Sequence, residues 1–288
     1  MITFPQNFPN ARRSFATGPN LPQSELSYSG LAQAGSDGHL VVHDSKGDGR
    51  RLSLLPENSN QLEEVSVDWS RTSQPEDLEA VAPLDGSPGT FMAVEGSRYN
   101  GRTPHLFLFN YADGKAETLE QFDLPQLPYE IEGMVTQKRA DGDLTVVLGG
   151  RGDSEGSPGS LHWGVYDVDQ QQMNWSEDGI SGIPVPLPED LGAGARPISD
   201  LLLTDEGELW ASGCTDQGDT GPFESLIYRV GQLDADASNP VTLTLDHATR
   251  VPGEKVEGLS TAGSHRVVIG TDNESFGGSI RTLSTKIG

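Results

Sequence analysis

Ile131-Glu132-Gly133-Met134 is the stretch that decides the fold of this chain, because variants of it recur along the whole length. Each copy has an apolar residue, then Ser or Glu, then a small residue, then a second apolar residue, with Asp200 as the exception at the third position. The five copies span residues 28–31, 78–81, 131–134, 198–201 and 256–259. Their Ser or Glu positions lie 50, 53, 67 and 58 residues apart. A unit that repeats about every 50 residues predicts a closed β-propeller or a repeat array.

The residues after each copy repeat one pattern of turns and strands. A turn rich in Asp and Gly comes first, such as Asp85-Gly86 or Asp141-Gly142, because Gly accepts the positive φ of a tight turn. Two apolar segments follow, which in the third unit are residues 144–148 and 161–166. We predict fourth strands within residues 61–69, 116–122 and 241–245.

The fifth unit reaches Gly288 before a fourth strand can form. A propeller removes two open sheet edges when an N-terminal strand completes its last blade. Ile2-Thr3-Phe4 or Arg13-Ser14-Phe15 can supply that strand. We therefore predict an all-β fold, a five-bladed β-propeller that forms a single domain over residues 1–288 and is closed by an N-terminal strand. Six blades is the alternative if residues 169–197 contain a further unit.

Composition restricts the partners and the compartment. The chain has 43 acidic and 19 basic residues, a net charge of −24, which disfavours DNA, RNA and anionic membranes. Cys214 is the one cysteine, so an intramolecular disulfide and a zinc-finger pattern are both excluded. The first residues resemble no signal peptide, and no window has the apolar length of a membrane span. If Met1 is the native start, we expect a soluble, cytoplasmic monomer; a chain trimmed of a leader would look the same.

The Ser or Glu of each copy is the candidate metal ligand. Strand side chains alternate, so this residue and the apolar residue two positions later share the channel face, and the small residue faces a neighbouring blade. Three converging glutamates repel one another, and either protonation or a bound cation relieves this. All-oxygen ligands suit Ca²⁺, whereas zinc and copper prefer imidazole or thiolate. A Ca²⁺ site and a polar channel filled with water are the two open interpretations. The predicted ligands are Ser29, Glu79, Glu132, Ser199 and Glu257.

The cyclic order Ser, Glu, Glu, Ser, Glu resembles that of the five-bladed calcium-activated nucleotidases, or apyrases. This resemblance implies that the same five residues hold a structural and catalytic Ca²⁺ in the tunnel. Of the acidic catalytic face of that family, Asp44 is the one candidate match in this chain. The Glu-Gly-apolar element also resembles the esterase-like domains related to bacterial phytases.

Loops between the second and third strands provide candidate catalytic residues, because these loops lie on the face where the inner strands begin. A rim of carboxylates and guanidinium groups around Ca²⁺ can bind a phosphate ester and activate water. We therefore predict a small anionic partner, a phosphate ester or nucleotide, and a Ca²⁺-dependent hydrolase of phosphate or related esters. The alternatives are a non-catalytic propeller with structural calcium and, for single residues, plain turn chemistry. The candidates are Asp44, Glu95, Arg98, Arg151 and Asp272.

Overall fold

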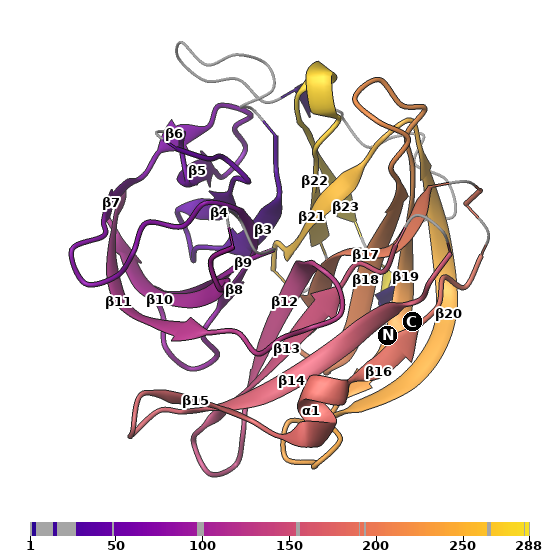
Figure 1. Cartoon of the computed structure of the whole chain (residues 1–288). Coiled ribbons are helices and arrows are strands. Elements are labelled where there is room, and N and C mark those ends of the chain that lie inside the picture. Colours follow the sequence, from indigo (N-terminus) through magenta and orange to yellow (C-terminus); the bar gives the residue numbers. More distant parts are fainter. Residues whose placement is uncertain are drawn as a thin grey trace.

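The computed structural model describes residues 2–3, 14–15, 27–47, 49–96, 101–153, 156–189, 191–192, 194–263, 266–284 and 286–287. These residues form five sheets of four or five strands and one two-stranded ribbon. The innermost strands contact one another in a closed cycle, and their labels encircle the centre of Figure 1. The fold is therefore a five-bladed β-propeller, as predicted.

The blades follow the chain in order, and each begins at one copy of the repeated motif. Blade 1 contains β3 (Gly30–Gln33), β4 (Gly38–Val42), β5 (Leu52–Pro56) and β6 (Glu63–Glu64). Blade 2 contains β8 (Leu78–Pro83), β9 (Thr90–Glu95), β10 (His105–Ala112), β11 (Lys115–Asp123) and, parallel to β11, β7 (Ser66–Asp68). Blade 3 contains β12 (Ile131–Lys138), β13 (Leu144–Gly150), β14 (Gly159–Asp167), β15 (Gln172–Trp175) and β16 (Ile183–Val185).

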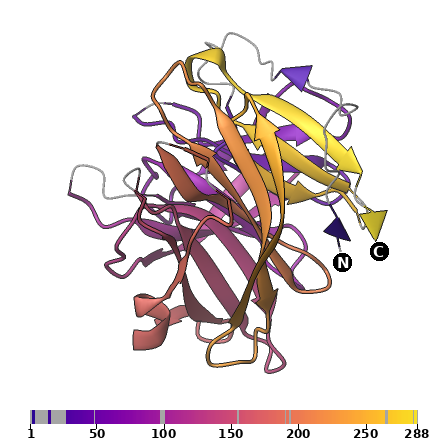
Figure 2. The ribbon, with the colours of Figure 1, turned by 90° about the vertical axis from the view of Figure 1, so that its right-hand side faces the viewer.

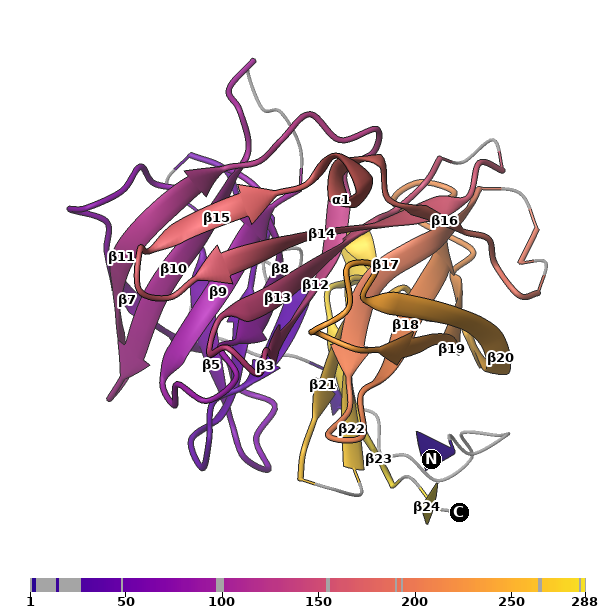
Figure 3. The same cartoon turned by 90° about the horizontal axis from the view of Figure 1, so that it is seen from below.

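Blades 4 and 5 complete the ring. Blade 4 contains β17 (Ala195–Leu203), β18 (Glu208–Thr215), β19 (Glu224–Leu233) and β20 (Val241–Pro252). Blade 5 contains β21 (Val256–Thr261), β22 (Arg266–Thr271), β23 (Ser279–Ser284) and β2 (Ser14–Phe15). Since β2 pairs with β23, the N-terminal strand that closes the ring is the second of the two predicted segments. The first segment supplies β1 (Ile2–Thr3), which pairs with β24 (Lys286–Ile287), and Figures 2 and 3 show these two strands side by side.

Two predicted segments have a different role in the structure. Residues 61–69 do not form one fourth strand: β6 completes blade 1, whereas β7 joins blade 2. The described part of residues 169–197 contains β15, β16 and the short helix α1 (Glu177–Ser181), and both strands pair with β14. This segment therefore belongs to blade 3 and is not a sixth blade. In the part of the chain that the structure describes, no helix is both long and apolar enough to cross a membrane.

Hydrophobic cores fill the spaces between neighbouring blades. The clusters join blades 1 and 2, 2 and 3, 3 and 4, 4 and 5, and 5 and 1. The small residue of the motif permits this packing: a Cβ added to Gly133 would lie 2.8 Å from the backbone N of Leu201 in the next blade. The small residue thus faces a neighbouring blade, as the alternation of strand side chains predicts.

A register shift interrupts three inner strands at the glutamate of the motif. The shifts fall between Leu78 and Ala80, between Ile131 and Gly133, and between Val256 and Gly258. The extra residue in each β-bulge is the glutamate, which has no partner in the strand pairing. A β-bulge changes the direction in which a side chain points. The local backbone geometry at the bulge, together with the alternation of strand side chains, therefore directs these glutamates away from the packing between blades and towards the axis.

Candidate metal and ligand site at the propeller axis

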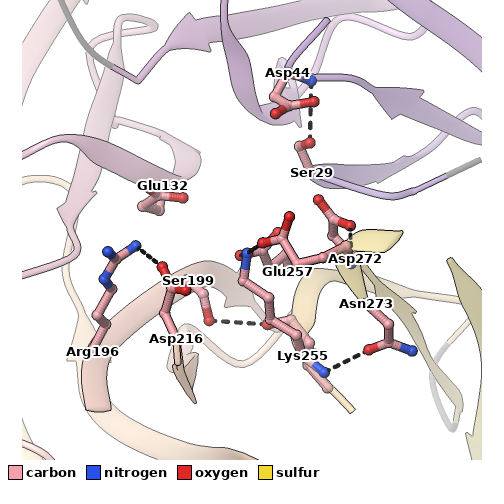
Figure 4. Close-up of polar contacts among 12 residues, drawn as sticks. Ser29, Asp44, Glu132, Arg196, Ser199, Asp216, Lys255, Glu257, Asp272 and Asn273 are labelled. Atoms are coloured by element: carbon pink, nitrogen blue, oxygen red, sulfur yellow. Dashed lines mark hydrogen bonds and ion pairs between the residues drawn. The ribbon is translucent and has the colours of Figure 1, made fainter. Parts of the chain in front are cut away.

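Residues from five blades meet at the end of the axis where the inner strands begin. Figure 4 shows Glu132 and Glu257 directed into a common space beside Ser29, with Lys255 against Glu257. Glu132 and Glu257 are buried, at 7% and 8% exposure, as are Ser29 and Ser199. Electrostatic coupling of Glu79 to Glu132 and Glu257 places the third carboxylate in the same cluster. The structure thus places the five predicted ligands at the same end of the axis, but it does not gather their carboxylates into a metal-binding cluster.

Burial disfavours the ionised form of the three carboxyl groups in this cluster and so raises their pKa values. Burial raises the pKa of Glu132 to about 7, although Arg151 and Lys255 act in the opposite direction. Burial also raises the pKa of Glu257 to about 7, against the attraction of Lys255. The pKa of Glu79 is raised well above its ordinary value, first by burial and then by the charges of Glu132 and neighbouring acids. The cluster therefore favours a proton or a further cation.

Two basic side chains reach the cluster, and each has a second acidic partner farther from the axis. Lys255 Nζ lies 3.0 Å from Glu257 Oε1 and 2.5 Å from Glu274 Oε1. Arg151 pairs with Glu132, 3.1 Å away, and with Glu130. Lys255 and Arg151 are therefore counter-ions of the glutamates, but neither depends on them for its only ion pair.

The two serines keep oxygen lone pairs available at the axis. The Ser199 hydroxyl donates to the backbone oxygen of Val256 at 2.9 Å, so its proton points away from the other ligands. Ser29 Oγ accepts a hydrogen bond from the backbone N of Asp44 at 3.2 Å. A hydroxyl oxygen has two lone pairs, so each serine retains acceptor capacity for a cation.

The surroundings of Glu79 indicate whether the ring can accommodate a cation. Among the described residues, its carboxylate has no hydrogen bond and no ion pair. Its side chain lies against Gly96, where an added Cβ would come within 2.4 Å of Glu79 Cγ, so only glycine leaves room for this acid. The Glu79 side chain is half-buried, and together with the other four residues it offers only oxygen donors, which Ca²⁺ prefers.

In this structure the acidic side chains of the ring lie farther apart than the ligands of a bound metal ion. Within the described ranges, no three His, Cys, Asp or Glu side chains gather closely enough to hold a metal ion. Calcium binding therefore requires Glu132 and Glu257 to exchange their present ion pairs for the metal. The second partners, Glu130 for Arg151 and Glu274 for Lys255, make this exchange possible without leaving either base unpaired.

The predicted rim residues are distributed unevenly around the site. Asp44 and Asp272 lie beside the ring, and the pKa of each is raised, first by burial; that of Asp272 reaches about 8. Arg151 reaches the ring directly. Glu95 instead accepts hydrogen bonds from the backbone N of Glu76 and of His105 at 2.9 Å and pairs with the His105 ring, inside blade 2. Arg98 lies outside the described residues.

Several residues of the site were missed by the sequence pattern. Lys255 is the most important, and Arg196, paired with Asp216 at 2.6 Å, and Asp77, paired with Lys46 at 2.9 Å, also lie around the ring. A signal for some of them was present, because Asp77, Glu130 and Lys255 each precede a motif glutamate by two positions. Each of these three residues directly precedes its inner strand, so this shared position indicates charged groups close to the ring.

The comparisons with known proteins support the fold. No family model and no curated protein match the chain. Among solved structures, an oxidoreductase described as a glucose dehydrogenase from Thermus thermophilus aligns with a TM-score of 0.51 and 13% identity, covering 96% of this chain and 100% of that one. The soluble aldose sugar dehydrogenase of Escherichia coli aligns with a TM-score of 0.51 and 10% identity, covering 96% and 99%. A GH43 β-1,3-galactosidase aligns with a TM-score of 0.47 and 7% identity, covering 91% of each chain.

At these identities the similarity is one of fold. The chain is a five-bladed β-propeller with an acidic site on its axis. The two sugar dehydrogenases share the fold of this chain and say nothing of its reaction. The reaction must therefore be argued from the side chains at the axis.

Proposed function

We propose that the axial ring binds Ca²⁺ and that the rim beside it hydrolyses phosphate or related esters. The observation that carries the proposal is the convergence of three bulge glutamates, one of which has no partner among the described residues. The proposed ligands are Ser29, Glu79, Glu132, Ser199 and Glu257. The order of these residues around the ring, which resembles that of the calcium-activated nucleotidases, supports the same ion.

In this proposal Lys255 and Arg151 are counter-ions of the ring glutamates, and a second ion pair holds each of them at the site. Without metal, they balance Glu257 and Glu132; when the metal binds, they keep their ion pairs with Glu274 and Glu130. After this exchange each of the two basic groups has one acidic partner in place of two. A phosphate group is held by such groups through charge-assisted hydrogen bonds, and Arg151 offers the forked geometry that suits it.

The chemistry of ester hydrolysis needs a bound anion and an oriented water. When bound, Ca²⁺ supplies a Lewis acid that polarises a phosphoryl oxygen. Asp44 lies beside Ser29 through its backbone N–H, and the residue is accessible to solvent, so it is placed to orient or deprotonate the attacking water. Burial raises the pKa of Asp272 to about 8 in the metal-free protein, which makes this carboxyl the candidate proton donor to the leaving oxygen.

A second candidate function is a non-catalytic propeller whose calcium has a structural role. The observation that favours it is the pairing of Lys46 with Asp77 and of Arg196 with Asp216, which occupies two bases otherwise free for substrate. Glu95 is likewise engaged with His105. Under this proposal the same face binds a small ligand or a protein and shows no turnover.

A calcium titration followed by thermal unfolding tests the metal site. Protein stripped with EDTA is the reference, and Ca²⁺ should raise the melting temperature in a saturable way because binding stabilises the folded state. Glu132→Gln should remove this rise, whereas Glu120→Gln, an exposed acid on β11, should retain it. No rise with the native chain would overturn the calcium proposal.

Turnover separates the two candidate functions. The calcium-loaded protein is assayed with p-nitrophenyl phosphate and with nucleoside diphosphates, and released phosphate is measured with and without EDTA. Calcium-dependent release that falls on Asp44→Asn supports the hydrolase. Calcium-dependent stability without phosphate release leaves the non-catalytic propeller.

A further inference from the structure

A cavity lies on the same axis, at the end where the inner strands turn into the second strands. Its volume is about 840 Å³, and every blade contributes to its wall. The wall includes the turn residues that follow the inner strands and none of the five ring residues. Ala34 in this wall is five residues beyond Ser29, or about 16 Å along a β-strand. Leu31, also in this wall, is only two residues beyond Ser29, or about 7 Å along the strand, so the cavity begins next to the acidic ring and extends away from it.

The inner wall of the cavity is apolar. It is formed by the fourth residue of each motif copy, all of which are buried: Leu31, Val81, Met134, Leu201 and Leu259. Two aromatic side chains, Phe91 and Tyr111, extend this wall toward blade 2. An apolar wall contributes binding free energy by removing hydrocarbon from water, and aromatic rings also attract cations.

The charged side chains of the described lining are all carboxylates, and its other polar groups are hydroxyls and amides, which both donate and accept hydrogen bonds. Carboxylates of Asp37, Asp85, Asp113 and Asp205 stand exposed around the mouth. Gln137 also lines the cavity, and its Oε1 is buried without a donor among the described residues. No Lys or Arg is present in the described lining; Lys138 lies against Gly86 outside it. An anion is therefore disfavoured here, and a ligand with several N–H donors is favoured.

We propose that this cavity binds a small organic cation, an alkyl ammonium compound whose aliphatic part lies on the apolar wall and whose charged group faces the aspartates. The apolar wall provides the surface on which the aliphatic part of the ligand packs. The aspartates at the rim select for positive charge, and they can accept the three hydrogen bonds that an ammonium group donates. Anionic phosphate compounds belong to the opposite end of the axis. The inference does not rest on the proposed calcium site or on hydrolysis.

The test is calorimetric titration with hexylamine at pH 7 and physiological salt. Hexanol and hexanoate are the matched neutral and anionic probes, and salt screens the long-range attraction of an acidic protein for any cation. Hexylamine should bind more tightly than hexanol, and hexanoate should not bind. The double variant Asp85→Asn/Asp205→Asn should weaken hexylamine binding by about tenfold, since each exposed ion pair contributes about threefold.

Two control variants keep the proposal falsifiable. The variant Asp169→Asn/Asp219→Asn removes the same charge from exposed positions outside the cavity and should leave hexylamine binding unchanged. Glu132→Gln changes the opposite end and should also leave it unchanged. Equal affinity for hexylamine and hexanol, equal weakening by both double variants, or loss of binding in Glu132→Gln would each overturn the proposal.

Discussion

The raised pKa values of Glu132 and Glu257 predict that the calcium-free protein becomes less stable as the pH rises from about 4.5 to about 7. Each carboxyl has an ordinary pKa of 4.5, which burial raises to about 7 in the folded protein. Between these values the folded state binds more protons than the unfolded state, so the free energy of unfolding decreases with pH. Below pH 4.5 both states are protonated and the penalty is absent; above pH 7 it is complete.

The magnitude follows from the difference in pKa. A rise from 4.5 to about 7 corresponds to about 3 kcal/mol for one carboxyl, and the mutual repulsion of the glutamates makes the two contributions non-additive. Calcium should reverse the trend, because a carboxylate ligand must lose its proton before it binds. The stabilisation by calcium should therefore increase from pH 5.5 to pH 7.5.

Urea unfolding at several pH values in EDTA, and again in saturating Ca²⁺, measures both effects. Since the whole acidic surface also loses stability as pH rises, Glu132→Gln is compared with Glu120→Gln, which removes an exposed charge. Glu132→Gln should be the more stable of the two at pH 8 by about 3 kcal/mol. Equal pH profiles for these variants would refute the assignment of the pH dependence to the ring.

Three further predictions follow from single contacts. Lys255→Met should increase calcium affinity by about tenfold, measured by competition with a chelating dye, because its ammonium competes for Glu257 at 3.0 Å. Asp200→Ala should lower the free energy of unfolding by about 3 kcal/mol, measured in urea, because the Asp200 carboxylate accepts from its neighbour in the chain and from the backbone N of Leu259 in blade 5 at 2.6 Å. Gly133→Ala should lower it by about 2 kcal/mol, because the new methyl group would meet the next blade.

Matched variants separate these effects from general damage. Lys46→Met removes a basic side chain that pairs with Asp77, and it should change calcium affinity less than Lys255→Met does. An unchanged affinity in Lys255→Met would contradict the counter-ion role. For packing, Gly133→Ala is compared with Ala80→Gly, the reciprocal change at the same motif position in blade 2. A Gly133→Ala variant as stable as the native chain would show that the blades can move apart at little cost.

The repeat made the architecture predictable, because the blade-to-blade contact requires the same residue types five times. The turn glycines illustrate this: Gly86, Gly142 and Gly207 all have positive φ, as the Asp-Gly pattern predicts. The division of residues 61–69 between two blades was not predictable, since the parallel pairing of β7 with β11 depends on how neighbouring blades lie. A periodic sequence pattern predicts that a segment forms a strand, but it does not predict which neighbouring strand that segment pairs with.

The same limit applies to the site. The ring residues could be predicted because each occupies the same place in its unit, but the bulges could not, since a register shift depends on the partner strand. Lys255 pairs with Glu257 two positions along the chain and Arg151 with Glu132 of its own blade, but the repeated motif contains neither basic residue. Asp200, the one charged residue at its motif position, is explained by the backbone N–H of Leu259, a partner that no local pattern indicates.

The pairing of β2 with β23 has a consequence for protein synthesis. Ser14–Phe15 must remain unpaired on the nascent chain until residue 280 has left the ribosome, because its partner strand does not exist before then. During that interval the growing chain has two exposed sheet edges, which are sites for pairing with other chains. The strand carrying Glu257 also emerges late, so the axial carboxylates come together only near the end of translation. Chaperone dependence of the nascent chain should therefore be greatest just before the last blade is made.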